Sequence, residues 1–212
     1  MSLISRLAEK SWQTPGDAGL ADPADYRPAA ATVGLYVYLG VATVIFTLMT
    51  AAYLMRMAMP GAMDHGGGSD WQPMPEPPLL WINTGVLVAS SLAWEVSRRS
   101  THLGASERMR LMAMTGGLLG LGFLAGQLVL WRHYQAAGYY LAANPANAFF
   151  YMLTAAHGLH LAGGLVAGGR AIAQLGEQTD RARTIRNVRL CAVYWHFLLL
   201  VWIVLVGLLV LT

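Results

Sequence analysis

The last stretch of the chain, "LCAVYWHFLLLVWIVLVGLLVLT" from Leu190 to Thr212, decides the fold. An α-helix needs roughly 20 apolar residues to cross a hydrocarbon core of about 30 Å, because it rises about 1.5 Å per residue. This stretch is long enough and apolar enough to do so. It also contains a histidine, His196, between Trp195 and Phe197. The stretch therefore predicts a transmembrane helix and raises the question of what an imidazole does within it.

The composition agrees with a membrane protein. Hydrophobic residues make up 56% of the chain and charged residues 12%, about half the charged fraction of a soluble globular protein. A soluble domain of this size would lack polar surface. The charges leave five apolar runs, which we expect to span the membrane: residues 33–55, 79–95, 111–131, 149–169 and 190–211.

The predicted fold is therefore an all-α integral membrane protein, a bundle of five transmembrane helices. We divide the chain into a polar N-terminal tail, residues 1–32, and a five-helix transmembrane domain, residues 33–212. The N-terminus lacks the pattern of a cleavable signal peptide. The lone cysteine, Cys191, excludes an intramolecular disulfide.

The basic residues predict the orientation of the helices. The tail carries three of them, the linker between the second and third runs four, and the linker between the fourth and fifth runs five. With five spans these segments share one side, and only Arg56 and Arg132 fall on the other side. The positive-inside rule places the N-terminus in the cytoplasm and the C-terminus outside. The net charge of +3 is thus a topology signal, and nucleic acid is not expected as a partner.

Histidines in the fourth and fifth runs lie at similar depth. His160 lies roughly 14 Å from the inner end of its helix and His196 roughly 10 Å from the inner end of its own. His157, three residues before His160, shares its face. Ionisable groups in a span usually face the bundle interior. With no carboxylate expected nearby, we predict neutral histidines that form hydrogen bonds between the fourth and fifth helices.

Three other kinds of site stay open on the residues alone. A haem would use His160 and His196 as axial ligands from two helices. A hydrolase would use Ser90 or Ser91 as nucleophile with His157 as base, although "VASSLAW" has no nucleophile elbow. A transporter would break its spans at matching places in two halves, and five unequal helices show no such symmetry.

Glycine spacing favours a packed structural bundle. Residues four apart lie on one helix face, and small residues at this spacing let helices approach closely in lipid. The chain has three such pairs, Gly116/Gly120, Gly122/Gly126 and Gly164/Gly168.

Three motifs resemble one known family. "PPLLWINTGVLVASS" (Pro77–Ser91), "FFYMLTAAHGLHLAGG" (Phe149–Gly164) and "YWHFLLLVW" (Tyr194–Trp202) are similar, in this order, to subunit III of the haem-copper oxidases, the cytochrome c and quinol oxidases. The resemblance extends from about Val33 to the C-terminus. It implies a non-catalytic accessory subunit that supports the stability and proton uptake of the catalytic subunit in aerobic electron transport.

The resemblance also implies the surroundings of the chain. Catalytic subunit I and subunit II would be its partners in the cytoplasmic membrane of a bacterium. Haem and copper would lie in those partners, with no metal, cofactor or catalytic residue in this chain, and phospholipid is a candidate ligand. An accessory subunit of a nitric oxide reductase and a stand-alone haem-binding or transport protein are the alternatives. Cytochrome c and quinol are equally compatible with the residues as the electron donor.

The family resemblance assigns roles to particular side chains. It implies that five of them tie helices together: Asn83, His157, His160, Trp195 and His196. The sequence departs from the family pattern at two places. The carboxylates that the family has in the first shared helix and after "YWHF" are replaced here, near Ala42 and Leu199, and a role in proton uptake would depend on them.

Two groups at helix ends complete the sequence predictions. We expect Trp131 and Arg132 to anchor the third helix in the headgroup layer or to contact lipid. We expect Glu95 to end the second helix as a solvated cluster, pairing with Arg98 and Arg99 three and four residues on.

The orientation can be tested by cysteine labelling. In a variant without Cys191, Gly176→Cys should react with a membrane-impermeant thiol reagent only from the cytoplasm, and Gly67→Cys only from outside. Labelling of both positions from one face would contradict the five-helix arrangement.

Overall fold

A computed structural model describes residues 29–58, 71, 75, 77–103, 105–174 and 181–211. Most of the predicted tail, residues 1–28, lies outside the described residues. The described chain is all-helical, as predicted. Its five helices are α2 (Ala30–Ala58), α3 (Pro78–His102), α4 (Ser106–Ala136), α5 (Pro145–Gln174) and α6 (Arg181–Leu211).

All five of these helices are long and apolar enough to cross a membrane. Each contains one of the apolar runs and extends beyond it at one or both ends. The length of an apolar run matches the thickness of the hydrocarbon core. The backbone hydrogen bonds of the helix continue beyond that run, through polar residues in the headgroup region. This chain is a multi-pass membrane protein.

Local signals explain where several helices begin and end. α3 and α5 each start with a proline, Pro78 and Pro145, whose missing N–H lies where a helix has no intrahelical acceptor for it. The side chain of Asn144 caps α5 by accepting a hydrogen bond from the N–H of Ala146, at 3.0 Å. After α4 ends, Gly138 adopts a φ of +90°, a conformation that glycine tolerates best.

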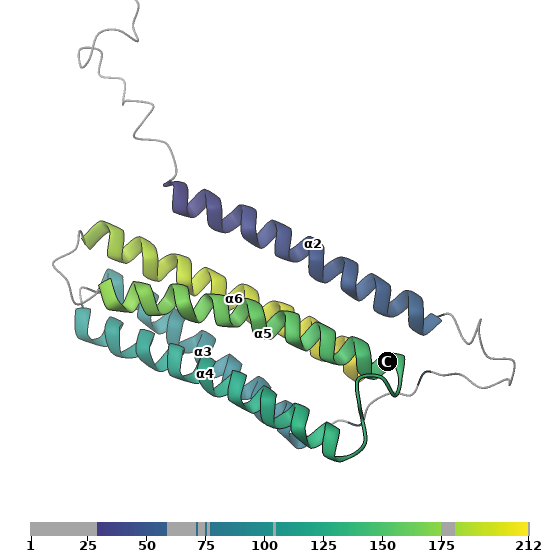
Figure 1. The fold of residues 1–212 in the computed structure, drawn as a ribbon. Helices are drawn as coiled ribbons and strands as arrows, with labels where there is room; N and C mark the ends of the chain where they lie inside the picture. The colour runs from purple at the N-terminus through teal and green to yellow at the C-terminus, as the bar shows by residue number, and fades with distance from the viewer. Residues whose placement is uncertain are drawn as a thin grey trace, which may run out of the picture. The chain divides into compact units, whose positions relative to one another are not determined.

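The chain divides into two compact units, Met1–Gly34 and Leu35–Thr212. In the second unit α3, α4, α5 and α6 form a closed four-helix arrangement (Figure 1). α3 packs against α4 and α6, and α5 packs against the same two helices. The fully buried side chains that fill the interior come from all four helices and include Leu87, Phe123, Leu161 and Leu198.

The part of α2 in the second unit packs differently. Only 11% of the most apolar window of α2 is buried, against 33–39% for the other four helices. Its buried residues are Leu39, Ala42, Phe46 and Tyr53. Phe46 packs on His160 of α5 with ring centroids 5.2 Å apart, and Tyr53 packs edge-on against Phe149 at 5.6 Å. Most of its surface is therefore left for lipid or for another chain.

Two tryptophans occupy the centre of the four-helix arrangement. Trp94 of α3 and Trp195 of α6 are both fully buried, with ring centroids 4.9 Å apart and ring planes at 35°. A methyl group added at Gly116 of α4 would lie 2.7 Å from Cδ1 of Trp94, and one at Gly168 of α5 would lie 3.0 Å from its Cζ2. Trp195 lies 3.4 Å from a methyl group added at Gly120 or at Gly164, which is an ordinary contact distance. The nearer side chains are Leu165, 3.2 Å from the methyl at Gly120, and Tyr194, 2.5 Å from the methyl at Gly164.

The predicted glycine pairs therefore make room for side chains. Gly116, Gly120, Gly164 and Gly168 form what we call the glycine cradle, which holds the two indole rings between α4 and α5. In the third pair, a methyl group at Gly126 would collide with the amide of Asn83, whereas one at Gly122 would lie 3.8 Å from Cγ1 of Val86, at ordinary contact distance.

The cradle gives a matched pair of substitutions on α4. Gly116→Ala should destabilise the bundle by about 1–3 kcal/mol, the usual cost of overpacking, because the methyl group meets a rigid, fully buried indole ring. Gly122→Ala should be neutral or stabilising. Unfolding of the purified chain in mild detergent measures both, and equal stability of the two variants would contradict the cradle.

Candidate functional site: polar ties between the helices

Trp195 connects three helices through one serine. Its Nε1–H donates to Oγ of Ser90 on α3 at 2.8 Å, and the Ser90 hydroxyl donates to the backbone carbonyl of Gly116 on α4 at 2.7 Å. Both side chains are fully buried. The predicted role of Trp195 as a tie between helices is consistent with this geometry.

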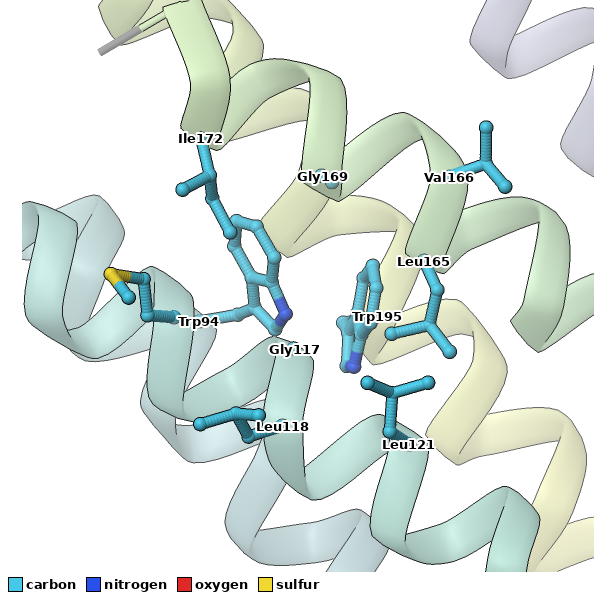
Figure 2. A pocket seen from close by; sticks show the side chains of 11 residues that line it. Trp94, Gly117, Leu118, Leu121, Leu165, Val166, Gly169, Ile172 and Trp195 are labelled. Atoms are coloured by element: carbon cyan, nitrogen blue, oxygen red, sulfur yellow. The ribbon is translucent and has the colours of Figure 1, made fainter. Parts of the chain in front are cut away.

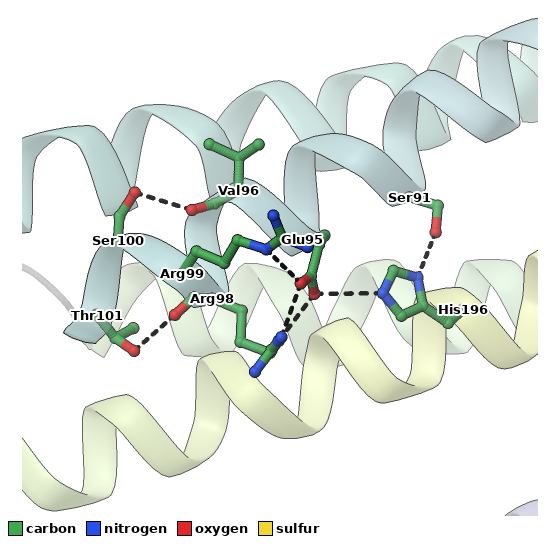
Figure 3. A network of polar contacts seen from close by, with 8 residues as sticks. All are labelled: Ser91, Glu95, Val96, Arg98, Arg99, Ser100, Thr101 and His196. Atoms are coloured by element: carbon green, nitrogen blue, oxygen red, sulfur yellow. Dashed lines mark hydrogen bonds and ion pairs between the residues drawn. The ribbon is translucent and has the colours of Figure 1, made fainter. Parts of the chain in front are cut away.

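His196 bonds to α3 through both ring nitrogens (Figure 3). Its Nδ1 lies 2.6 Å from Oγ of Ser91, and its Nε2 lies 3.4 Å from Oε2 of Glu95. An ionised carboxylate only accepts, so Nε2 carries a proton toward Glu95. Both ring nitrogens of His196 thus have a partner on α3.

Glu95 joins this network to two arginines. Its carboxylate accepts two hydrogen bonds from Arg98, at 2.7 and 2.8 Å, and one from Nε of Arg99 at 2.8 Å. The predicted pairing within the helix is confirmed. The predicted helix end is wrong, because α3 continues to His102. The predicted solvation holds for Arg99, which is 73% exposed, but not for the Glu95 side chain, which is 14% exposed. The expectation that no carboxylate lies near His196 is also wrong.

Ser91, His196 and Glu95 have the residue types of a hydrolytic triad, but the geometry does not support hydrolysis. Ser91 is 1% exposed, so a substrate carbonyl cannot reach its hydroxyl. It also lies inside α3, where the backbone N–H groups that an oxyanion hole needs are used by the helix. The serine meets His196 and not His157, the base that the sequence suggested.

His160 forms its hydrogen bond within its own helix. Its Nδ1–H donates to the carbonyl of Ala156, one turn earlier, at 2.7 Å. The predicted hydrogen bonding of His160 with His196 between the fourth and fifth helices is therefore wrong, because His196 faces α3. The two imidazoles also do not face a common space as axial ligands of one haem would. α5 and α6 are joined instead by the Tyr194 hydroxyl, which donates to the carbonyl of His160 at 2.8 Å.

His157 is held by aromatic rings. It is fully buried between Phe46, Phe123 and Trp202, with ring centroids 6.4, 5.7 and 5.1 Å away. Within the described part of the chain neither of its ring nitrogens has a hydrogen-bond partner. The hydrogen bond that we predicted is not found, and the imidazole fills space between α2, α4, α5 and α6.

Further ties use amide, indole and hydroxyl groups. The Asn83 amide of α3 donates to Oε1 of Gln127 on α4 at 3.3 Å, and both side chains are buried. Nε1 of Trp131 on α4 donates to Oγ1 of Thr154 on α5 at 3.2 Å. Trp202 of α6 similarly donates to Thr84 of α3 at 3.0 Å. These contacts join each helix of the closed arrangement to a neighbour.

The predicted interfacial pair divides between two environments. Trp131 is half-buried and engaged with α5, whereas Arg132 is exposed near the end of α4, where a headgroup contact stays a prediction. Among the described residues, no group of three or more His, Cys, Asp or Glu side chains is placed to hold a metal ion.

Sequence reasoning did not assign the partners of these ties. Ser90 and Ser91 were considered only as nucleophiles, and Thr84, Gln127 and Thr154 were not considered. The available signal was their position inside apolar runs, where small hydroxyl and amide side chains serve as glue between helices. The partner of each of these side chains depends on how its helix is rotated about its axis. An apolar run predicts the helix but not this rotation.

No protein-family model matches the chain. Its amino-acid sequence is 30% identical over 183 residues to a "Probable cytochrome c oxidase subunit 3" of Mycobacterium leprae, covering 84% of this chain and 86% of that protein. The chain belongs to the cytochrome c oxidase subunit 3 family. The subunit 3 of Bacillus subtilis cytochrome c oxidase is 26% identical, with 81% of each chain covered. The subunit 3 of Pseudomonas aeruginosa cytochrome bo(3) ubiquinol oxidase is 26% identical, covering 80% of this chain and 79% of that one.

Membership of the subunit 3 family agrees with the resemblance seen in the sequence motifs. Those motifs supply the polar ties: Asn83 and Ser91 from the first, Thr154 from the second, and Trp195 and His196 from the third. The three motifs therefore contain several of the residues that join α3, α4, α5 and α6.

The tie between Ser91 and His196 predicts energetic coupling. In a double-mutant cycle, Ser91→Ala and His196→Leu should show a coupling energy of about 0.6 kcal/mol, and at most about 2, in unfolding experiments in detergent. The control cycle combines Thr43→Ala with His196→Leu and should show additive effects, because the Thr43 hydroxyl bonds to Leu39 on its own helix. Additive effects of the first pair would show that the contact carries no interaction energy.

Proposed function

We propose that this chain is a non-catalytic accessory subunit of a respiratory haem-copper terminal oxidase in the cytoplasmic membrane of a bacterium. Its membership of the subunit 3 family carries the proposal. The site geometry supports it, because Trp195, His196 and Asn83 form hydrogen bonds from one helix to another. In this role the chain supports the stability of the catalytic subunit during aerobic electron transport.

The proposed partners are the catalytic subunit I and subunit II of the oxidase, together with membrane lipid. Haem and copper lie in those partners, and the chain itself binds no redox metal. Cytochrome c and ubiquinol oxidases both occur among the names of the relatives, so either donor is compatible with the proposal. The proposed orientation has the N-terminus in the cytoplasm, which is supported by the excess of arginine and lysine on that side.

A contribution to proton uptake is a further part of the proposal. Family carboxylates have no counterpart at Ala42, which is buried, or at Leu199. Among the described residues the acidic side chains are Glu95 and Glu107, and only Glu95 lies beside a membrane histidine. Any acid of this chain that assists proton uptake within the described spans would therefore be Glu95.

Isolation of the native complex tests the proposed function. The chain, tagged and expressed at its native level, should be purified from mild detergent with a larger membrane subunit that contains haem and copper, in a fixed stoichiometry. Optical spectra, metal analysis and mass spectrometry of the partner chains provide the measurement. A chain that is recovered alone with its own haem, or with a partner that contains haem and non-haem iron but no copper, would contradict the proposal and favour one of the alternatives.

A further inference from the structure

A polar cluster lies on the outer surface of the bundle, between α3 and α6 (Figure 3). It consists of Glu95, Arg98, Arg99 and His196. The side chain of His196 is 47% exposed, more than that of any other histidine of α5 and α6. It lies six residues inside the apolar run 190–211, about 9 Å from the beginning of that run. The cluster therefore extends from the end of the span into the depth of the hydrocarbon core.

This position is unusual for ionisable side chains in a membrane. Such side chains generally face the interior of a bundle or a water-filled cavity, because hydrocarbon offers them no hydrogen-bonding partner. His157 follows this rule and is fully buried, whereas His196 lies at the surface beside Glu95. A polar group from outside the chain is therefore needed to cover the cluster.

The face of α3 beside the cluster has the spacing of a helix-packing seam. Its residues follow one another at intervals of 4, 3, 4, 3 and 4, and each is exposed or half-buried: Trp81, Gly85, Val88, Leu92, Glu95 and Arg99. An average spacing near 3.5 residues keeps side chains aligned along a second helix. Gly85 and the exposed Ala89, four residues later, let such a helix approach closely, and a Cβ at Gly85 would meet nothing within 4 Å. We call this seam, together with His196, the α3–α6 face.

The charge of the cluster indicates the chemistry of the partner. The two guanidinium groups of Arg98 and Arg99 face the single carboxylate of Glu95, so one positive charge is in excess. Arg99 is 73% exposed and bonds to Glu95 through Nε, and within the described residues its terminal nitrogens have no acceptor. A carboxylate fits a guanidinium in this state, because it can accept two parallel hydrogen bonds. A second copy of the chain does not fit, because a symmetric dimer would bring the same cationic faces together.

The opposite side of the four-helix arrangement has a different character. A groove of about 400 Å³ lies there between α4 and α5, and Figure 2 shows Leu118 and Leu121 among its lining side chains. None of the residues that line this groove is ionisable. Hydrocarbon can cover such a surface without loss of hydrogen bonds, so the α4–α5 side provides matched control positions.

We propose that the α3–α6 face binds a transmembrane helix of a different chain, which packs closely at Gly85 and pairs a carboxylate with Arg99. This helix covers the outward side of His196, and its carboxylate neutralises the excess positive charge. The docking face follows from the surface of this chain alone. The identity of the docked chain as the catalytic subunit of an oxidase rests on the proposed function.

The first test identifies what lies against this face in native membranes. A photo-reactive benzoylphenylalanine replaces Leu92, which is 60% exposed on the α3–α6 face, or Leu118, which is 66% exposed on the α4–α5 side. Illumination of the Leu92 variant should give an adduct with another polypeptide, and illumination of the Leu118 variant should not give this adduct. Trp81, exposed on the same face as Leu92, provides a second position where one aromatic side chain replaces another.

Analysis of the cross-linked chain separates the docking face from the proposed function. A chain that belongs to a complex with haem and copper supports both. A chain from a complex without these groups supports the docking face and contradicts the proposed function. Adducts with lipid alone or with a second copy of this chain, or no adduct from either Leu92 or Trp81 variants, would overturn the docking face.

The second test blocks the close approach. A Cβ would meet nothing within 4 Å at Gly85 of the α3–α6 face or at Gly169 beside the groove, so Gly85→Leu and Gly169→Leu should both fold. Gly85→Leu should lower the ratio of copurified partner to tagged chain at least about tenfold in mild detergent, and Gly169→Leu should leave it unchanged. Unfolding of the two variants in detergent confirms that both are folded. Equal partner recovery with both variants would overturn the proposal.

The third test addresses the carboxylate. Arg99→Gln should lower partner recovery about tenfold, because a hydrogen-bonded charge pair is lost, whereas Arg99→Lys keeps the charge and should restore most of it. Arg108→Gln removes an exposed arginine from the first turn of α4 and should leave recovery unchanged. Partner recovery that is the same with Arg99→Gln as with wild type would contradict the proposed pairing.

Discussion

The contact between Trp94 and Trp195 is the interaction on which the other packing depends. The two indole rings come from α3 and α6, and Trp94 fits between α4 and α5 because Gly116 and Gly168 leave no side chain in its way. In lipid there is little hydrophobic gain in bringing helices together, so close packing and internal hydrogen bonds must supply the stabilisation. The cradle supplies the packing, and the Trp195–Ser90–Gly116 relay adds hydrogen bonds at the same place.

The polar side chains follow from the same constraint. A donor or acceptor inside a bilayer is costly unless it finds a partner within the protein. Ser91, Glu95 and His196 meet this requirement together, and Asn83 meets it with Gln127. This is the arrangement expected of a subunit whose task is to keep its shape beside a catalytic partner, which is why we favour an accessory role.

Helix count and membrane character could be predicted from the amino-acid sequence, because apolar runs measure bilayer thickness directly. Residue 196 could be placed in a span, but its partner could not be identified. His196 and His160 lie at similar depth, but depth does not determine how each helix is rotated about its axis. In the structure His196 bonds to Ser91 of α3, and His160 bonds to Ala156 of its own helix. Glycine spacing indicated close approach, but the aromatic rings that fill the cradle come from α3 and α6, far away in the sequence.

The central claim is that His196 and the serines of α3 hold the bundle together while the chemistry takes place in another subunit. The most direct measurement is the initial turnover of purified oxidase that carries His196→Leu with the mutant subunit still bound at full stoichiometry. The account predicts initial turnover close to that of wild type, with faster loss of the subunit in detergent and faster decay of activity during sustained turnover. Near-complete loss of initial turnover would contradict the account, because His196 would then take part in the reaction or in its proton supply.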